Sequence, residues 1–287
     1  MLSPGLFLPM GVPRPLLVLP ALLSCSLSAL PAAPPPSGDA PQEAEAPAFD
    51  HTHAAWTEIL RSCVHEGGFD YAALKQDPAR LERYLAALHA VTPEGTLGWS
   101  PEQRFAFWIN AYNAHTIQKV VQNYPLASIR KLDKALGLKT VFEQAFIPMR
   151  AFHPDGKDED LALNDIEHGI LRKKFKDARV HAAVNCASAS CPPLRNEAFV
   201  AERLDEQLDE QMRAFVADEK HNRFQRDRGR IEISEIFEWF AEDFERDAQS
   251  VQEYLVRFAA PEDADFLRKA KVSYVDYDWS LNDVPKR

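Results

Sequence analysis

Apolar residues recur at spacings of three and four along most of the chain, and this helical periodicity is the feature that most limits its fold. In the segment 198–217, for example, Val200, Leu204 and Leu208 share one face of a helix, while acidic residues occupy the other faces. The sequence therefore predicts a fold dominated by helices. The segments with this pattern are 54–64, 78–91, 101–123, 164–175, 198–217, 234–246 and 250–259.

Strand-like segments are fewer and shorter than the helical ones. Residues 145–152, followed by 161–163, resemble a hairpin with a loose connecting loop. The other candidates are 179–184, 230–233 and 272–277. We therefore expect an α+β fold, a mostly helical single domain with a small antiparallel sheet.

The beginning of the chain differs in composition from the rest. An apolar run followed by small residues makes residues 1–29 typical of a signal peptide. Residues 30–52 are rich in proline, alanine and acidic residues, a composition that favours a disordered linker over a packed core. We therefore expect the globular domain at 53–287 in an exported protein, either periplasmic or secreted.

Charge and lipidation set the expected partners. Lysine and arginine number 33 against 43 aspartate and glutamate, which gives a net charge of −10. A negative surface without a basic cluster argues against nucleic acid and against anionic membranes as partners. An alternative to simple export is a lipoprotein signal in which Cys25 is acylated, and this anchor is the one membrane attachment that we expect.

Residues 179–194 gather reactive side chains at the end of a short apolar run. We interpret the segment as a strand that runs into a rigid turn stopped by two prolines, which allows His181 and Cys186 to meet. A thiol beside an imidazole loses its proton more readily, so Cys186 is a candidate nucleophile. Alternatively, Cys186 and Cys191 form a disulfide that closes the turn.

The two serines between these cysteines have two interpretations. Ser188 and Ser190 either bond their own backbone or present hydroxyl groups to a ligand. They lack a Gly-x-Ser-x-Gly elbow, which argues against a hydrolase serine. The chain also lacks the spacings of common zinc sites, so we expect no metal and no cofactor, although His168, His181 and Cys186 could in principle meet as ligands.

The segment 105–120 places two amides among aromatic residues. Asn110 and Asn113 lie three residues apart and share one face of the predicted helix. Buried amides must find hydrogen-bond partners, so one interpretation is a structural clamp on a loop backbone. The other is that one asparagine orients a catalytic imidazole or donates to an oxyanion.

Residues 164–172 carry a third polar motif. Asn164 and Glu167 have the spacing of a capping box, which would explain Glu167 without any chemistry. His168 would then lie in the first turns of this helix, next to apolar residues. It is either a buried or surface histidine without a role or a catalytic base.

These motifs combine into a pattern that resembles family 547 of the domains of unknown function. FWINAYNAHTI, DIEHGILR, VHAAVNCASASCPPL, SEIFEWFAEDF and YDWSLN occur in the family's order between about Gly68 and Asn282. The resemblance does not imply a particular reaction. Carried over to this sequence, the motif positions that the resemblance implies are Trp108, Asn110, Tyr112, Asn113, Glu167, His168, His181, Cys186, Ser188, Ser190, Cys191 and Pro192.

Two functions are compatible with these residues. The first is a thiol-dependent hydrolase or acyl transferase that acts on an amide or ester, with Cys186 as nucleophile, His181 or His168 as base, and Glu167 or an asparagine orienting it. In this hypothesis Trp108, Tyr112 and the two serines contact a small-molecule or peptide ligand, and the backbone of 188–190 forms an oxyanion hole. The second is a non-catalytic binding or scaffolding module whose polar residues form a structural network.

Overall fold

The long helix α4 is the centre of the fold. The computed structural model describes residues 48–134 and 138–285. Helix α4 spans Pro101–Asn123, as the sequence predicts, and most of its residues are buried. Ser100 and Gln103 form a capping box at its start, which bonds amide groups that the first turn leaves without partners.

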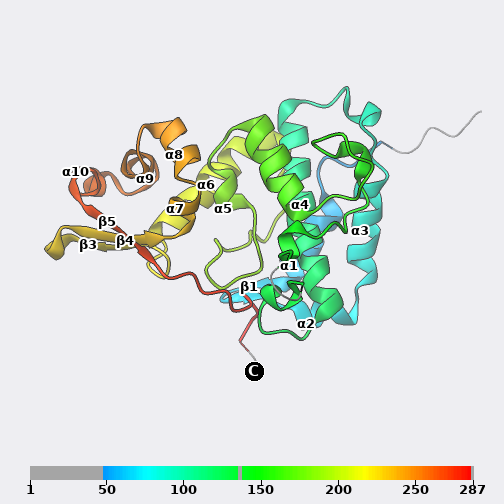
Figure 1. The fold of residues 1–287 in the computed structure, drawn as a ribbon, viewed down its shortest axis with the longest axis horizontal. Helices are drawn as coiled ribbons and strands as arrows, with labels where there is room; N and C mark the ends of the chain where they lie inside the picture. The colour runs from blue at the N-terminus through cyan, green and yellow to red at the C-terminus, as the bar shows by residue number, and fades with distance from the viewer. Residues whose placement is uncertain (1–47, 135–137, 286–287) are drawn as a thin grey trace, which may run out of the picture. The chain divides into compact units, whose positions relative to one another are not determined.

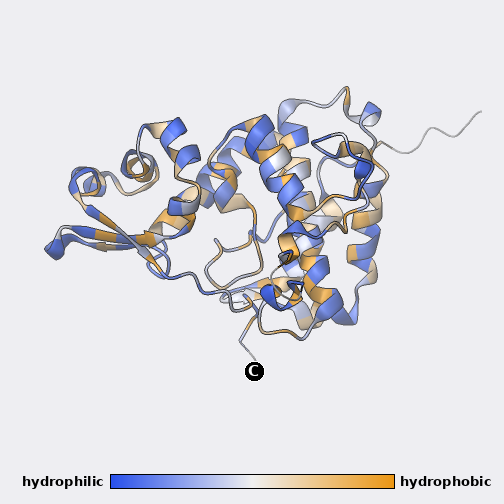
Figure 2. Cartoon of the chain, viewed as in Figure 1, coloured by the Kyte–Doolittle hydropathy of each residue, from blue (hydrophilic) through white to orange (hydrophobic). Residues whose placement is uncertain are grey.

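The larger of two hydrophobic cores surrounds this helix. The apolar faces of the neighbouring helices turn toward α4, and Figure 2 shows helices with hydrophobic residues on one side and hydrophilic residues on the other. The helices of this part are α1 (Ala54–Cys63), α2 (Tyr71–Gln76), α3 (Ala79–His89), the π-helical η6 (Asp165–Phe175), α5 (Val180–Ala183) and α6 (Leu204–Ala217).

The smaller core lies under a three-stranded sheet in the second part of the chain. Its strands are β3 (Arg223–Gln225), β4 (Arg230–Ser234) and β5 (Lys271–Val275), with β4 in the middle. The helices α7 (Ile236–Trp239), α8 (Ala241–Ala248), α9 (Val251–Phe258) and α10 (Ala264–Lys269) connect β4 to β5. In Figure 1 this sheet lies at one end of the described chain and α1 to α4 lie at the other.

The expected α+β class is confirmed, since the fold is mostly helical with a small sheet. Strands β3 and β4 pair antiparallel, as expected, whereas β5 pairs with β4 in parallel. A parallel pair needs a long crossover, and the four helices between these strands supply it.

A second, smaller sheet lies against the C-terminal part of the described chain. Strands β1 (Val64–His65) and β2 (Gly68–Phe69) form a hairpin, and Phe69 donates its amide to the carbonyl of Asn282 at 2.9 Å. Gly68 has a φ of +154°, and a Cβ atom there would lie 2.4 Å from the Asn282 carbonyl oxygen. Only glycine therefore lets the C-terminal segment, residues 276–284, pass so close to the hairpin.

Several short 3₁₀ turns complete the described chain. They occur mainly in connections and at helix ends, where this tighter geometry is common. They are η1 (Glu94–Thr96), η2 (Ile129–Leu132), η4 (Val141–Glu143), η5 (Arg150–Phe152), η7 (Ala201–Arg203), η8 (Arg226–Arg228) and η9 (Pro261–Asp263).

Three local predictions are wrong. Residues 179–184 are not a strand, because Val180–Ala183 form the short helix α5 before the chain extends at Val184. The predicted hairpin 145–163 is reduced to one antiparallel bridge between Ile147 and Leu161. The capping box at Asn164 does not form, since Asn164 is itself helical and its side chain makes no capping hydrogen bond.

The boundary of the expected linker also lies too far along the chain. Phe49 packs against Trp99 and Phe107, with ring centroids 5.4 and 5.3 Å apart, so this part of residues 30–52 belongs to the folded body. The signal peptide at 1–29 and the acylation site Cys25 lie outside the described residues. No helix in the described part of the chain is long and apolar enough to span a membrane.

Candidate functional site

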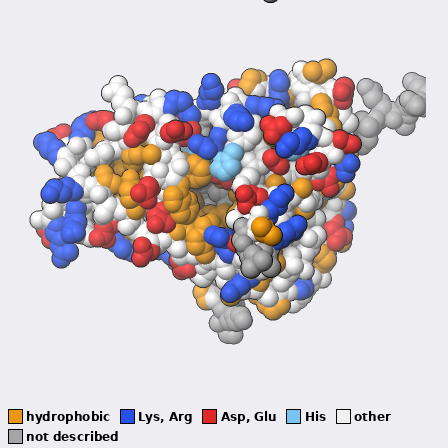
Figure 3. All heavy atoms as spheres, in the orientation of Figure 1, with side chains coloured by type: hydrophobic (Ala, Val, Ile, Leu, Met, Phe, Trp, Pro, Cys, Tyr) orange, Lys and Arg blue, Asp and Glu red, His pale blue; other side chains and the backbone are white. Residues whose placement is uncertain are grey.

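A cavity of about 180 Å³ opens where the two hydrophobic cores meet. The larger core contributes Tyr112 and Val184 to its wall, and the smaller core contributes Ile236 and Phe240. Figure 3 shows hydrophobic side chains gathered around a hollow on this face. Among the sequence-predicted site residues, those that line the cavity are Tyr112, Glu167, His168, His181, Cys186 and Cys191.

His181 lies on α5 and is held by two neighbours. Its ring stacks on Phe240 with the centroids 3.9 Å apart, and Nε2 lies 2.8 Å from Oδ2 of Asp243. Because Asp243 is a carboxylate, Nε2 carries the proton and donates it. Nδ1 of His181 is then a lone-pair acceptor, and it is buried without a hydrogen-bond partner. Burial lowers the pKa of His181, even though the bond to Asp243 opposes this shift, so the ring is neutral at pH 7.

Asp243, on α8, is the charged anchor of this group. Its Oδ2 accepts from Nε of Arg172 at 2.5 Å, and its Oδ1 accepts from Arg246 at 2.8 Å. Burial alone would raise the pKa of Asp243, but the hydrogen bonds from His181 and Arg172 bring it well below its usual value. Asp243 is therefore ionised at every physiological pH and fixes the tautomer of His181.

Cys186 and Cys191 are free thiols with their sulfur atoms 2.7 Å apart. Cys186 is partly exposed, whereas Cys191 is buried. The hydroxyl of Tyr277 lies 3.2 Å from the Cys186 sulfur and donates to the Cys191 sulfur at 3.4 Å. Ser188 donates to the same Tyr277 oxygen at 2.9 Å, so its hydroxyl holds Tyr277 in position beside the two sulfur atoms.

The hydrogen bonds divide the charge unequally between the two thiols. Burial raises the pKa of Cys186, and the sulfur of Cys191 raises it further. Burial also acts on Cys191, but there the hydrogen bonds from Cys186 and Tyr277 outweigh it and lower the pKa to about 7. The backbone amide of Cys186 adds a donor to the Cys191 sulfur at 3.0 Å. Near neutral pH the pair thus holds a proton on Cys186 and a large fraction of negative charge on Cys191.

The loop between the two cysteines is fixed by the C-terminal segment. Ala189 donates its amide to the carbonyl of Ser280 at 2.7 Å, and Ser190 donates to the carbonyl of Asp278 at 3.3 Å. The expected oxyanion hole in the backbone of 188–190 is therefore wrong for these two amides, because both are already bonded. The Ser190 hydroxyl is also used, since it accepts from the amide of Asp278 at 2.8 Å.

Glu167 and His168 reach the cavity from η6. With the capping box absent, Glu167 is buried in the cavity wall instead of closing a helix end. Burial raises the pKa of Tyr112, and the nearby carboxylate of Glu167 raises it further, so the Tyr112 hydroxyl stays protonated and able to donate. Nδ1 of His168 accepts from Arg172 at 3.2 Å.

Asn110 and Asn113 do not reach the cavity, and both act as structural clamps. Asn110 donates to the carbonyl of Phe199 at 2.7 Å and accepts from its amide at 3.1 Å. Asn113 bonds the carbonyl of Ala183 and the amide of Asn185 in the same manner, at 2.9 and 2.8 Å. These contacts favour the clamp interpretation over the catalytic one, because backbone groups occupy both ends of each amide.

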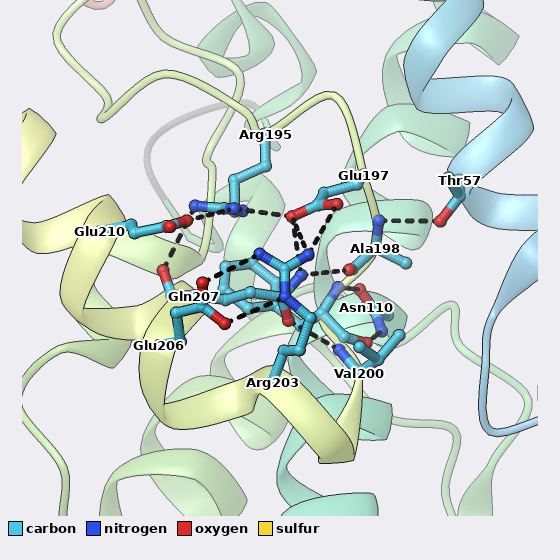
Figure 4. A network of polar contacts seen from close by, with 11 residues as sticks. Thr57, Asn110, Arg195, Glu197, Ala198, Val200, Arg203, Glu206, Gln207 and Glu210 are labelled. Atoms are coloured by element: carbon cyan, nitrogen blue, oxygen red, sulfur yellow. Dashed lines mark hydrogen bonds and ion pairs between the residues drawn. The ribbon is translucent and has the colours of Figure 1, made fainter.

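Asn110 belongs to a wider network that fixes the loop before α6 (Figure 4). Gln207 accepts from the amide of Val200 and donates to the carbonyl of Ala198, both at 2.9 Å. Arg195 bonds Glu197 at 2.7 Å on the same side. This network is structural, and none of its members lines the cavity.

Two of the residues expected to contact a ligand lie elsewhere. Trp108 is buried in the larger core, with its ring 5.1 Å from that of Phe107 and 5.2 Å from that of Phe152. Ser188 is buried behind the thiol pair. No hydrogen bond joins His181 or His168 to either sulfur in the part of the chain that the structure describes, so the expected thiol–imidazole contact is not formed.

Comparison with known proteins identifies the part of the chain that forms one side of this cavity. The family described as "Protein of unknown function, DUF547" matches residues 96–216. These residues are a DUF547 domain. The matched part contains α4, η6, α5 and both cysteines of the pair. Neither the curated proteins nor the solved structures that were compared with the chain gave a match.

Several residues of the site lie beyond the DUF547 match and were not among the predicted site residues. The cavity residues Trp239, Tyr277 and Trp279, and Asp243, which bonds His181, come from the motifs SEIFEWFAEDF and YDWSLN, which the resemblance already included. Their presence in these two motifs was the sequence signal that could have identified them as site residues. Within 48–134 and 138–285, no group of three His, Cys, Asp or Glu side chains has an arrangement that could hold a metal ion.

Proposed function

We propose that this DUF547 protein is a thiol-dependent hydrolase or acyl transferase that acts on an ester or amide of a small molecule or peptide. The observation that carries the proposal is a single cavity lined by His181 and by two free cysteines. We further propose that the reaction occurs outside the cytoplasm, because residues 1–29 have the composition of a signal peptide.

Cys186 is the nucleophile in this proposal because it is the exposed member of the pair. The charged sulfur of Cys191 takes the proton of Cys186 as the Cys186 sulfur attacks the carbonyl carbon. The bond between this carbon and the oxygen or nitrogen of the leaving group then breaks, and the leaving group departs with that proton. The product of this step is a thioester on Cys186.

His181 acts in the second half of the reaction. Nδ1 of His181 accepts a proton from water or from an acceptor alcohol or amine, whose oxygen or nitrogen attacks the thioester. The carbon–sulfur bond breaks, and the Cys186 sulfur takes the proton that Nδ1 of His181 accepted, which returns the imidazole to its neutral form. Asp243 stabilises the imidazolium that forms.

Turnover of p-nitrophenyl esters and of matched anilides by reduced protein tests this proposal. We expect Cys186→Ser to lower kcat/KM by at least about a thousandfold, because it removes the nucleophile. Cys63→Ala is the matched control, since Cys63 is a free thiol buried in the larger core. Turnover that survives in Cys186→Ser, with thermal stability unchanged, would contradict the proposal.

The competing function is a non-catalytic binding module. The network in Figure 4 favours it, because Asn110 of α4 is used there in structural hydrogen bonds to the backbone of Phe199. Alkylation kinetics separate the two functions. If Cys186 is the nucleophile, iodoacetamide labels it without reductant and faster than Cys63, and labelling slows below pH 7 as the thiol pair takes up a second proton. A binding module predicts that Cys186 labels as an ordinary partly exposed thiol, with no break in its labelling rate near pH 7.

A further inference from the structure

We propose that the acyl group taken by this cavity is uncharged and apolar, with a chain of about six carbon atoms or a single ring as its upper size. This inference rests on the proposed function, because it names the substrate class of the same site. Three properties of the cavity carry it: the chemistry of its wall, its lack of available cations, and its volume.

One wall of the cavity is aromatic. Trp239, Tyr277 and Trp279 pack on one another, with the ring of Tyr277 4.7 Å from each tryptophan ring. Phe142 extends this surface, since its ring lies 6.0 Å from that of Trp279. Because the three rings contact one another, they leave no space between them for a cation. They therefore form a continuous apolar wall and not an aromatic cage. Such a surface favours a hydrocarbon chain or ring over a polar group.

Positive charge is not available to an anionic acyl group. No lysine or arginine of the described residues lines the cavity. The two guanidinium groups that lie over rings of the cavity wall are already engaged. Arg172 bonds Asp243 and lies over the ring of Phe240, and Arg130 bonds Asp133 and lies over the ring of Trp279. A carboxylate at the far end of the acyl chain would lie against the aromatic wall and lose its water without gaining an ion pair.

A cationic chain is disfavoured for a related reason. Glu167 is the one carboxylate among the described residues that line the cavity, and it lies near Tyr112 on the side of the cavity formed by α4 and η6. An ammonium group at the far end of an acyl chain bound to Cys186 would lie against the aromatic wall and lose its water without gaining an ion pair. A neutral hydrocarbon chain has no charged group to dehydrate at this wall, so it binds without that cost in free energy.

The volume sets the size limit. A protein cavity of about 150 Å³ holds one benzene ring, so a cavity of about 180 Å³ holds a ring with a small substituent or about six carbon atoms. Trp239 is the most exposed part of the wall, with 44% of its surface accessible. Because it is both a lining residue and exposed, a longer chain would leave the cavity beside it, and this part of the proposal makes Trp239 the residue that limits chain length.

Binding of primary amides to Cys186→Ala protein tests this inference without requiring turnover. Titration calorimetry with acetamide, butanamide, hexanamide, octanamide and decanamide should show affinity that rises about fourfold per methylene up to hexanamide and then stops rising. Hexanamide should bind at least about tenfold more tightly than 6-aminohexanamide or 5-carboxypentanamide. Tighter binding of either charged amide, or affinity independent of chain length, would overturn the inference.

Trp239→Ala should move the limit to octanamide or decanamide. Tyr274→Ala is the matched control, because Tyr274 is an exposed aromatic residue of β5 that does not line the cavity. Trp279→Ala is a second variant that enlarges the cavity from the other side of Tyr277. Unchanged limits in both tryptophan variants would contradict the assigned wall.

The same chain lengths as p-nitrophenyl esters separate this inference from the proposed function. If wild-type protein turns over p-nitrophenyl hexanoate fastest, the result supports both the proposed function and this inference. Amides that bind with the expected limit while no ester is turned over would contradict the proposed function and leave the apolar site standing. Turnover that is fastest for acetate would overturn the inference and leave the thiol chemistry standing.

Discussion

Two groups of buried polar side chains flank the segment from Ala183 to Cys191, and they differ in how their hydrogen-bonding capacity is used. On the α4 side, Asn110 and Asn113 each bond a backbone amide and a backbone carbonyl. On the cavity side, His181 uses one ring nitrogen and leaves the other without a partner. A buried polar group with a complete set of partners stabilises the fold, whereas one with spare capacity beside a cavity is a candidate for chemistry.

The largest expected effect is on stability and comes from the clamp. Asn113→Ala leaves the carbonyl of Ala183 and the amide of Asn185 buried without this partner, which should lower the free energy of unfolding by about 3 kcal/mol in a urea titration. Asn123→Ala, at the exposed end of the same helix, should cost less than about 0.5 kcal/mol. A stable but inactive Asn113→Ala protein would move this residue into the catalytic group.

The next effect is on activity and comes from the cavity. Asp243→Asn should lower kcat/KM about a hundredfold, because the amide no longer fixes the tautomer of His181 or stabilises its charged form. The carboxylate also raises the pKa of His181, so its removal should move the acid limb of the deacylation rate, the step in which His181 is the base, to lower pH.

Glu245→Gln is the control for this change, since Glu245 is an exposed acid on the same helix. It should leave both the rate and the profile as they are. A slower Asp243→Asn enzyme with an unshifted acid limb would reduce Asp243 to a structural role.

A third test acts on both regions through the C-terminal segment. Gly68→Ala places a methyl group against the carbonyl of Asn282 and should cost about 2 kcal/mol of unfolding free energy. The same segment holds the loop between the two cysteines, so activity should fall as well. Gly98→Ala, which would meet no atom within 4 Å, should change neither quantity.

The smallest expected effect is a pH dependence that originates on α4. Burial lowers the pKa of His115 to about 3, so the folded protein keeps this ring neutral while the unfolded chain protonates it near pH 6.5. Its contribution to stability is complete above pH 6.5 and is lost as the pH falls. Between pH 7.5 and 5.5 the loss should be about 1 kcal/mol, and His115→Gln should remove that much of the measured slope. An unchanged slope would show that His115 is charged in the folded state.

The sequence predicts those features of the structure that depend on residues close together in the chain, and it predicts less well those that depend on tertiary packing. The bounds of α4 follow from local signals, namely its apolar positions and the capping pair at Ser100 and Gln103. Residues 179–184 were misassigned because an apolar run this short fits a strand and a buried helix equally well.

The site shows the same division. The sequence predicts His181 and Cys186 as cavity residues, because both lie in one short polar motif. Asp243 and Tyr277 could not be assigned a role, since they lie 62 residues from His181 and 91 residues from Cys186 in the chain and meet them through tertiary packing alone. The failure of the Asn164 capping box likewise becomes apparent only when the backbone at its start is seen to be helical.

Trapping the acylated protein tests the central claim most directly. Reduced protein is mixed with p-nitrophenyl hexanoate, quenched in acid within the first turnover and analysed by peptide mass spectrometry. The account predicts one hexanoyl group on the peptide that contains Cys186, and none on Cys186→Ser protein. A hexanoyl group on Cys63, no acylation at all, or a Cys186–Cys191 disulfide that persists in protein kept under reductant would contradict it.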